Sequence, residues 1–192
     1  EVGSVQIQNS GTLAGNLCNA SPAADGMPPL LTLDASVELA SPAGIRVVPL
    51  SDFVLGVRQT ALRPAELVSA ILLPEVSATA TGSFMKIGAR KYLVISITMV
   101  AALISVVNGR IIEARVAVGA CSAVAQRVPL LEAALLGCGV ADAVDQIYPA
   151  HLEQLSPISD MRGSAQYRGE AALELCRRAV TGALQDGARC NG

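Results

Sequence analysis

The sequence predicts an α+β fold in which antiparallel strands pack against helices. Three observations carry this prediction. An Asn108-Gly109 pair separates two long apolar segments, several short apolar segments in the first half are bounded by proline or glycine, and the final part has helical periodicity. Asn-Gly supplies the two positive-φ positions of a type I′ hairpin turn, which joins antiparallel strands. We therefore expect antiparallel sheets that are covered by helices.

Residues 6–25 are rich in glycine, alanine and short polar side chains and carry no positive charge. Glycine permits positive φ and close approach of a ligand, and successive exposed N–H groups can hold an anion. We expect this segment to be a loop that carries the chemistry of the chain. Its residues alone make it a weak candidate for binding a phosphate-bearing cofactor, because most segments of this composition are simple turns.

A hairpin is predicted after this loop. Pro28-Pro29 is expected to stop any helix, and residues 30–39 alternate as a strand does. Residues 41–44 place proline and glycine at the second and fourth positions of a turn. Residues 46–50 should then return as the second strand.

The segment 66–73 is assigned as a third strand because it is short and bracketed by prolines, although its periodicity also fits a helix. Small and polar residues at 75–82 mark the expected domain boundary. We divide the chain there into a first domain, residues 1–78, and a second domain, residues 79–192.

The second domain is predicted to hold a three-stranded antiparallel sheet packed on helices. Its first strand covers 83–90, and its second, 93–107, is rich in β-branched residues, which favour strands. Its third strand, 110–120, pairs back through the Asn-Gly turn. Glu113 and Arg115 share one side of the third strand, and we expect that side to face solvent.

Three helices are expected to follow. Pro129 suits the first turn of one helix, and Gly137 suits its end. A short helix is expected at 141–148, and a long one at about 164–185 with Ser164 as its N-cap. Apolar residues spaced three and four apart predict the core-facing stripe of the long helix. The stripe consists of Ala172, Leu175, Cys176, Ala179 and Val180.

Composition narrows the classes of function. Of the 192 residues, 52% are hydrophobic and 16% are charged, against a charged share of roughly 25% in typical globular domains. We expect a partner subunit, or a further part of the same polypeptide, to cover much of the surface. The net charge of −2 without a basic block argues against nucleic acid as a partner. The apolar run 93–107 is too short for a membrane span.

Five scattered cysteines and one histidine, His151, lack the spacing of a metal site. The wide spacing also argues against a disulfide framework. We expect mostly buried thiols, a histidine that caps an element or lies at the surface, and a reducing, cytoplasmic location. The chain begins at Glu1 without a basic-then-apolar leader, and we expect it to be a piece of a longer protein.

The run QIQNSGTLAGNL at 6–17, with its continuation to Asp25, resembles the second flavin-binding motif of the molybdenum hydroxylase flavoproteins. These are the FAD subunits or domains of xanthine dehydrogenase, carbon monoxide dehydrogenase and 4-hydroxybenzoyl-CoA reductase type enzymes. The segments 33–39 and 58–66 follow the family's order and spacing, and the part from 83 to about 180 resembles its C-terminal domain. The resemblance implies that the first domain is the second subdomain of a two-subdomain FAD-binding fold. It implies that the second is a CO dehydrogenase flavoprotein-like C-terminal domain.

The resemblance also implies which residues contact FAD. The matching positions are Thr12, Leu13, Ala14, Gly15, Asn16, Ser21, Asp25, Val68 and Lys86. Backbone amides and hydroxyls can serve flavin oxygens, Asp25 can accept from a sugar or ribityl hydroxyl, and Lys86 can complement negative charge. Each also has a purely structural explanation as a turn, a cap, a core residue or a solvated charge. No catalytic acid, base or nucleophile and no metal ligand is expected.

Departures from the family pattern limit the inference. Gln8 stands where the motif usually carries arginine, Ala14 replaces a second glycine, and residues 91–94 lack the acidic residues frequent in the family. The family's N-terminal subdomain, with its other glycine-rich loop, is not in this chain. We therefore expect the chain alone to bind FAD weakly or not at all.

The implied function is that of the FAD-binding electron-transfer component of a molybdenum-dependent hydroxylase or dehydrogenase. Electrons would pass from a molybdenum-cofactor subunit through a [2Fe-2S] subunit or domain to FAD, and then to NAD or another acceptor. The implied partners are those subunits and the N-terminal FAD subdomain. One alternative is a flavin-free assembly or interaction module with the same scaffold. Another is a different FAD enzyme with the same two-subdomain fold, against which the second domain argues.

Overall fold

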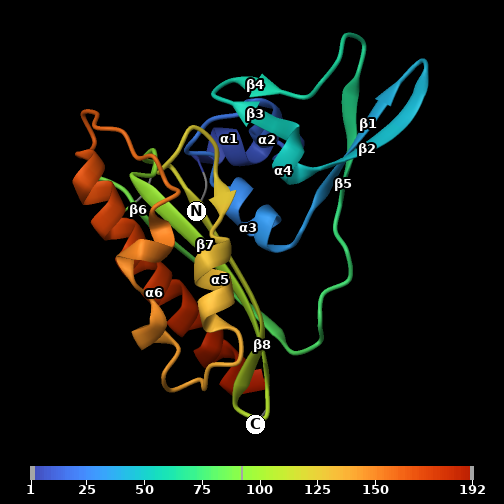
Figure 1. The fold of residues 1–192 in the computed structure, drawn as a ribbon. Coiled ribbons are helices and arrows are strands. Elements are labelled where there is room, and N and C mark those ends of the chain that lie inside the picture. Colours follow the sequence, from blue (N-terminus) through green and yellow to red (C-terminus); the bar gives the residue numbers. More distant parts are fainter. Residues whose placement is uncertain (1–2, 92, 191–192) are drawn as a thin grey trace.

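The computed structural model describes residues 3–91 and 93–190, with side chains up to residue 186. It contains two main antiparallel sheets, a two-stranded ribbon and several helices (Figure 1), which confirms the α+β class. The elements are α1 (Val5–Ser10), α2 (Leu13–Cys18), α3 (Met27–Thr32), β1 (Ser36–Ser41), β2 (Gly44–Pro49), α4 (Leu50–Phe53), β3 (Val54–Gly56), β4 (Gln59–Thr60), β5 (Leu67–Leu72), β6 (Ala80–Ile87), β7 (Thr98–Val107), β8 (Arg110–Gly119), β9 (Gln126–Arg127), α5 (Pro129–Leu135), the 3-10 turns η1 (Val144–Gln146) and η2 (Pro149–Leu152), and α6 (Ala165–Cys190).

The larger sheet has the strand order β6-β7-β8-β9. β7 and β8 pair antiparallel through a turn in which Asn108 and Gly109 have φ of 51° and 72°, as the Asn-Gly pair predicted. β6 pairs antiparallel with the other edge of β7, so the three predicted strands are present, although β6 covers 80–87 instead of 83–90 and β7 begins at Thr98 instead of residue 93. The fourth strand, β9, was not predicted because two residues are too few to show a period.

Helices cover both faces of this sheet. α5 and α6 pack on one face, where alternate β7 residues such as Val100 and Ile104 are fully buried. All five residues of the predicted α6 stripe are buried, and the Ser164 hydroxyl caps the helix by accepting from the Tyr167 amide at 3.1 Å. α3 lies on the opposite face against β7 and β8, and Ala117 of β8 belongs to the core of the first half.

The smaller sheet has the order β2-β1-β5 and projects away from the larger one (Figure 1). The hairpin of β1 and β2 and the strand assignment of β5 are both confirmed. Val37 and Leu39 of β1 face a core that includes Leu17 of α2 and Phe53 of α4. Burial therefore docks α2 and α4 to this sheet, whereas α1 has no buried residue.

Two predictions for the first half were wrong. Pro28-Pro29 does not exclude a helix but starts one, because both prolines lie in the first turn of α3, where a missing N–H costs nothing. The strand therefore begins only at Ser36. Residues 6–25 are not simply a loop: they form α1 and α2, which Ser4 and Thr12 cap with their hydroxyls.

Two predictions for the second half were also corrected. The short helix expected at 141–148 is only the 3-10 turn η1 flanked by turns. Glu113 and Arg115 do not face solvent, because α3 and the turn after it lie over their side of β8. The Arg115 side chain is only 18% exposed.

The described cysteines are free, two of them buried and two half-buried, and the side chain of Cys190 lies outside the described part. Burial raises the pKa of the Cys121 and Cys176 thiols, so they remain protonated core residues. His151 acts as a cap, because its Nδ1 accepts from the Tyr148 amide at 3.2 Å. Among the described residues, no cluster of potential metal ligands occurs, and no helix is both long and apolar enough to cross a bilayer.

Candidate functional site

The centre of the candidate site is a charged cluster that joins the two halves of the chain. Lys86 Nζ of β6 lies 2.6 Å from Asp25 Oδ2, and the Ser96 hydroxyl donates to Asp25 Oδ1 at 2.7 Å. The side chains of Asp25 and Lys86 are 9% and 21% exposed. Two residues predicted from the motif and one that was not predicted therefore meet at one carboxylate.

Asp25 is held in place from both sides by its own segment. On one side, Asn16 Oδ1 of α2 accepts from the Gly26 amide at 3.2 Å. On the other, the Pro22 carbonyl accepts from the Ala120 amide at the end of β8, at 2.9 Å. These bonds connect α2, the 19–26 segment and the larger sheet, so the carboxylate has a fixed position relative to β6.

The other motif residues line the same stretch of chain. The Thr12 hydroxyl accepts from the Gly15 amide at 2.9 Å as the cap of α2, and the Ser21 hydroxyl accepts from the Ala23 amide at 3.3 Å. Gly15 and Leu13 are exposed, and Ala14 is half-buried. The capping role predicted as the plain explanation of Thr12 is thus present, and the backbone of α2 is still accessible.

Val68 is placed differently from the other predicted residues. It lies on β5, half-buried, and packs against the core that also contains Leu17 of α2. Val68 therefore packs in the same core as α2. Its strand pairs with β1 in the smaller sheet, whereas Lys86 lies on β6 of the larger sheet.

Two cavities adjoin the Asp25 cluster. One, of about 460 Å³, is lined by Lys86, Gly88, Arg90 and Ser96 among others. The other, of about 450 Å³, lies on the far side of Ser96 between Ser21 and Arg168. Ser96 lines both, so the cluster lies where the two cavities approach each other.

Arg168 of α6 forms the buried wall of the second cavity, with a 4% exposed side chain. It donates to the carbonyls of Ile97 and Ala120, and its Nη2 lies 2.8 Å from Asp160 Oδ1. Its Nε is buried without a hydrogen-bond partner. This arginine therefore ties β7, β8 and the 156–163 segment together around the cavity.

Three residues of the site were missed by sequence reasoning: Gly26, Ser96 and Arg168. Ser96 had a usable signal, because it is the first hydroxyl in a long apolar run. Arg168 lies in the run 164–168, which resembles the family's C-terminal domain, but nothing in that run indicated its role, and Gly26 had no signal. Their roles depend on contacts with Asn16 and Ile97, which are distant in sequence.

Gly26 is required by the close approach of α2. A Cβ built on Gly26 would lie 2.9 Å from both Asn16 Oδ1 and Leu13 Cδ1, closer than atoms pack without rearrangement. We expect Gly26→Val to break the Asn16 bond and to destabilise the chain by about 1–3 kcal/mol, the usual cost of overpacking. Urea unfolding measures the loss of stability. Gly109→Asn is the control, because a side chain at residue 109 would meet no other atoms and asparagine tolerates the positive φ of that turn. An unchanged midpoint for Gly26→Val would contradict the proposed packing.

Two ion pairs should make stability depend on acidic pH. The amide of Arg162 and the Arg168 guanidinium hold the pKa of Asp160 at about 2, and Arg46 holds that of Glu66 at about 2. Because both folded-state pKa values lie below the unfolded values of roughly 4, the stabilisation is present above about pH 4.5 and is lost as pH falls towards 2. Urea midpoints measured from pH 6 to 2.5 should fall less steeply for Asp160→Asn and Glu66→Gln. Unchanged pH profiles would contradict the assignment.

Two known protein families match the two halves of the chain. The family described as the FAD binding domain in molybdopterin dehydrogenase matches residues 1–76. The CO dehydrogenase flavoprotein C-terminal domain family matches residues 83–183. The candidate site takes residues from both matched ranges, since Asp25 lies in the first and Lys86 in the second.

Individual relatives agree with this placement. The chain is 33% identical over 186 residues to the nicotine 6-hydroxylase medium subunit of Paenarthrobacter nicotinovorans, covering 96% of this chain and 63% of that one. It is 32% identical over 179 residues to the carbon monoxide dehydrogenase medium chain of Afipia carboxidovorans, covering 91% of this chain and 61% of that one. The chain thus spans somewhat less than two thirds of these curated relatives.

Solved structures show the same fold. CO dehydrogenase from Oligotropha carboxidovorans superimposes with a TM-score of 0.89 at 28% identity, over 96% of this chain and 64% of that one. Quinoline 2-oxidoreductase from Pseudomonas putida 86 gives a TM-score of 0.86 at 30% identity, over 97% and 65% of the two chains. The chain therefore belongs to the family of FAD-binding medium subunits of the molybdenum hydroxylases.

Proposed function

We propose that this chain forms part of an FAD site in the electron-transfer component of a molybdenum-dependent hydroxylase or dehydrogenase. The observation that carries the proposal is the Asp25 carboxylate, which Lys86 and Ser96 hold beside a cavity of about 460 Å³. Lys86 and Ser96 line this cavity, and the carboxylate that they hold lies directly behind them, so the site offers one strong donor and one strong acceptor in fixed positions. Such a pair suits a ligand that carries both hydroxyls and anionic oxygens, as FAD does.

The chemical groups of the residues present suit FAD as a ligand. Thr12, Gly15, Asn16 and Ser21 offer hydroxyl, amide and backbone groups on an accessible surface, and each is proposed to orient the cofactor. Leu13, Ala14 and Val68 are proposed to supply apolar contact. Both oxygens of Asp25 already accept one bond each, and an ionised carboxylate oxygen can accept a second. When bound, the flavin would supply the redox chemistry, so the protein groups need only bind and orient it.

The proposed route runs from a molybdenum-cofactor subunit through a [2Fe-2S] subunit or domain to FAD, and then to NAD or another acceptor. The described residues contain no metal-ligand cluster, so in this proposal the partners supply the metals. The cavity next to Ser21 and Ser96, of about 450 Å³, supports an approach for the acceptor beside the flavin site. The described cysteines are free, which is consistent with a protein that functions in the reducing cytoplasm.

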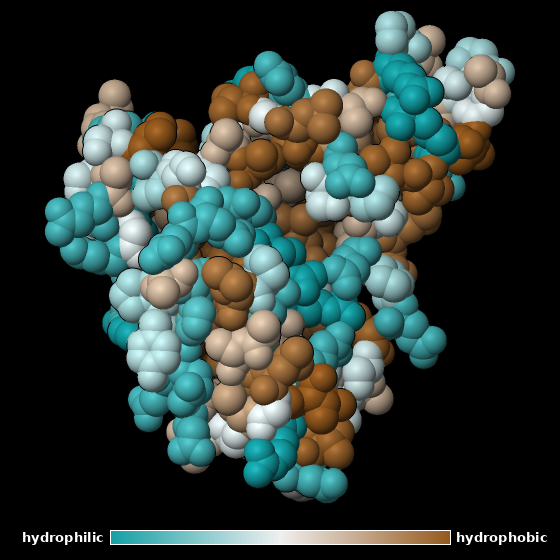
Figure 2. Space-filling model, viewed as in Figure 1, coloured by the Kyte–Doolittle hydropathy of each residue, from teal (hydrophilic) through white to brown (hydrophobic). Residues whose placement is uncertain are grey.

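Exposed apolar side chains on the projecting sheet support the proposal that partner subunits bind this chain. Large apolar side chains are exposed on the projecting sheet, including Ile45 at 66%, Val47 at 53% and Leu67 at 60%. Hydrophobic side chains gather over β1, β2 and β5 in Figure 2. We propose that the molybdenum and iron–sulfur subunits, or the N-terminal FAD subdomain, cover this surface.

We also propose residues 1–78 and 79–192 as the two domains, with the Asp25–Lys86 pair between them.

Spectroscopy of the intact protein, purified from its host together with its neighbouring subunits, tests the proposed function. We expect flavin absorbance bands that correspond to about one FAD per chain and that bleach when the complex is reduced. A complex without flavin bands would contradict the proposal and would favour a flavin-free assembly module.

The 192-residue chain by itself is expected to bind FAD weakly and to be inactive. The curated relatives are longer by more than a third of their length, and we propose that the remaining part of such a subunit completes the cofactor site. A flavin titration of the isolated chain, followed by fluorescence quenching, measures this. Tight stoichiometric binding would contradict this expectation and leave the assignment of the site itself intact.

A further inference from the structure

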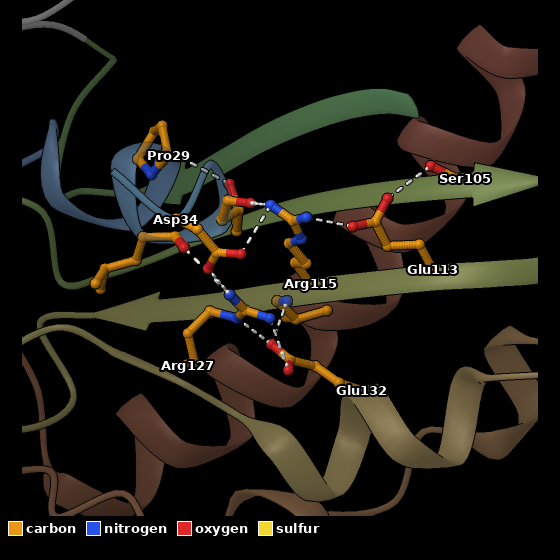
Figure 3. Close-up of polar contacts among 10 residues, drawn as sticks. Pro29, Asp34, Ser105, Glu113, Arg115, Arg127 and Glu132 are labelled. Carbon is orange, nitrogen blue, oxygen red and sulfur yellow. Dashed lines mark hydrogen bonds and ion pairs between the residues drawn. The ribbon is translucent and has the colours of Figure 1, made fainter. Parts of the chain in front are cut away.

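A second charged cluster joins the two halves at the opposite end of α3 (Figure 3). Asp34, in the turn after α3, accepts from two arginines of the larger sheet. Arg115 Nη1 of β8 lies 3.0 Å from Asp34 Oδ2, and Arg127 Nη1 of β9 lies 2.6 Å from Asp34 Oδ1. We call these three residues the α3 clamp.

Both arginines of the clamp are fixed on the sheet side. Arg127 pairs through Nε and Nη2 with the two oxygens of Glu132 in α5, and Glu132 also accepts from the Val116 amide at 2.8 Å. Arg115 pairs with Glu113, which accepts from the Ser105 hydroxyl at 3.0 Å. Bidentate and networked guanidinium contacts of this kind resist reorientation.

The clamp also holds the end of the helix itself. Arg115 Nη1 donates to the Thr32 carbonyl at 3.2 Å, and Arg127 Nη1 donates to the Leu31 carbonyl at 3.3 Å. These carbonyls lie in the last turn of α3, where the negative end of the helix dipole favours cations. Asp34 adopts φ of 49°, so the chain turns sharply away directly after the contact.

α3 therefore has both ends fixed to one sheet. Asp25 and Gly26 precede its first residue, and a six-residue helix rises only about 9 Å. Its first turn is seated closely on the sheet, because a Cβ on Gly119 of β8 would lie 3.0 Å from Pro28 Cγ. A short rigid element with two fixed ends cannot tilt at one end without moving the other.

We propose that Arg115 and Arg127 are positioning residues of the flavin site: by holding Asp34 and the last carbonyls of α3, they fix Asp25 against Lys86 and Ser96. The inference rests on the proposed function, because it assigns the clamp to the same site. The arginines act through α3 and touch neither Asp25 nor Lys86 in the described contacts.

Hydrogen exchange in the intact, flavin-free protein tests the mechanical part. Arg127→Met and Asp34→Asn should each speed exchange of the amides at 24–27 by about tenfold through local opening. Asn keeps the left-handed turn. Two controls should leave these amides unchanged. Arg178→Met removes an exposed pair with Glu174 on α6, and Ile147→Val loosens a buried residue remote from α3. Equal acceleration in Ile147→Val would overturn the proposal.

FAD affinity in the intact complex tests the link to the flavin site. Arg127→Met should raise the Kd of FAD about tenfold, within the range of couplings between networked residues. In an Asp25→Asn background the same substitution should raise the Kd by less than about twofold, because the clamp acts through the position of that carboxylate. Equal increases in both backgrounds would show a general structural effect and overturn the proposal.

The two experiments separate the possible failures. If the intact complex binds no FAD, the proposed function fails, and the exchange of the amides at 24–27 still decides whether the clamp fixes Asp25. If FAD binds and exchange is unchanged in Arg127→Met, the clamp inference fails and the proposed function remains.

Discussion

Replacing Lys86 by methionine is expected to weaken FAD binding to the intact complex by roughly a hundredfold, about 2.7 kcal/mol, as for the loss of a charged hydrogen bond. Two losses contribute. The ammonium would no longer complement the cofactor, and Asp25, with a side chain only 9% exposed, would keep Ser96 but lose its cation. Removing one partner of a nearly buried pair leaves a charge poorly compensated. Equilibrium titration with FAD measures the change.

Arg110→Met is the matched control for this prediction. It removes a cation from the far end of the same sheet, where Arg110 donates to the Gly137 carbonyl at 2.8 Å. Lys86→Arg should restore much of the affinity, because it keeps the charge, although its planar group fits a different geometry. Wild-type affinity in Lys86→Met would remove this residue from the proposed site.

Of the substitutions considered, Arg168→Met is expected to cause the largest loss of stability, about 3–4 kcal/mol, the combined cost of leaving two buried carbonyls without a donor. The substitution would leave the Ile97 and Ala120 carbonyls without their donor and would separate the 156–163 segment from the sheet. Urea unfolding should show a lower midpoint with an unchanged slope. The corresponding fall in Tm is about 6–16 °C for a chain of this size.

The surface ion pair of Arg178 and Glu174 provides the comparison. Its side chains are 64% and 47% exposed, so Arg178→Met should change stability by less than about 0.5 kcal/mol. If Arg168→Met were equally mild, the guanidinium could not be the element that holds the wall of the second cavity together.

Local sequence signals predicted the elements that depend on local chemistry. The Asn108-Gly109 turn, the Ser164 cap and the α6 stripe all follow from positive-φ, capping and periodicity rules, and all are present. Lys86 and Asp25 entered through a motif resemblance, and the structure brings them together. Whether FAD contacts them stays a prediction.

The remainder could not be predicted because it depends on contacts between distant segments. Pro28-Pro29 predicts the absence of a helix, but tertiary packing on Gly119 favours α3 with its prolines in the first turn. Arg115 was expected in solvent, but α3 covers it. Periodicity describes one strand and gives no information on which helix lies above it, so buried ion pairs across the two halves escaped detection.

The location of FAD in a structure of the intact complex tests the central claim most directly. We expect polar atoms of the cofactor within hydrogen-bond distance of Lys86 Nζ or the Asp25 carboxylate, with the backbone of α2 beside it. FAD bound elsewhere in the complex, with the Asp25–Lys86 pair facing only protein or water, would contradict it.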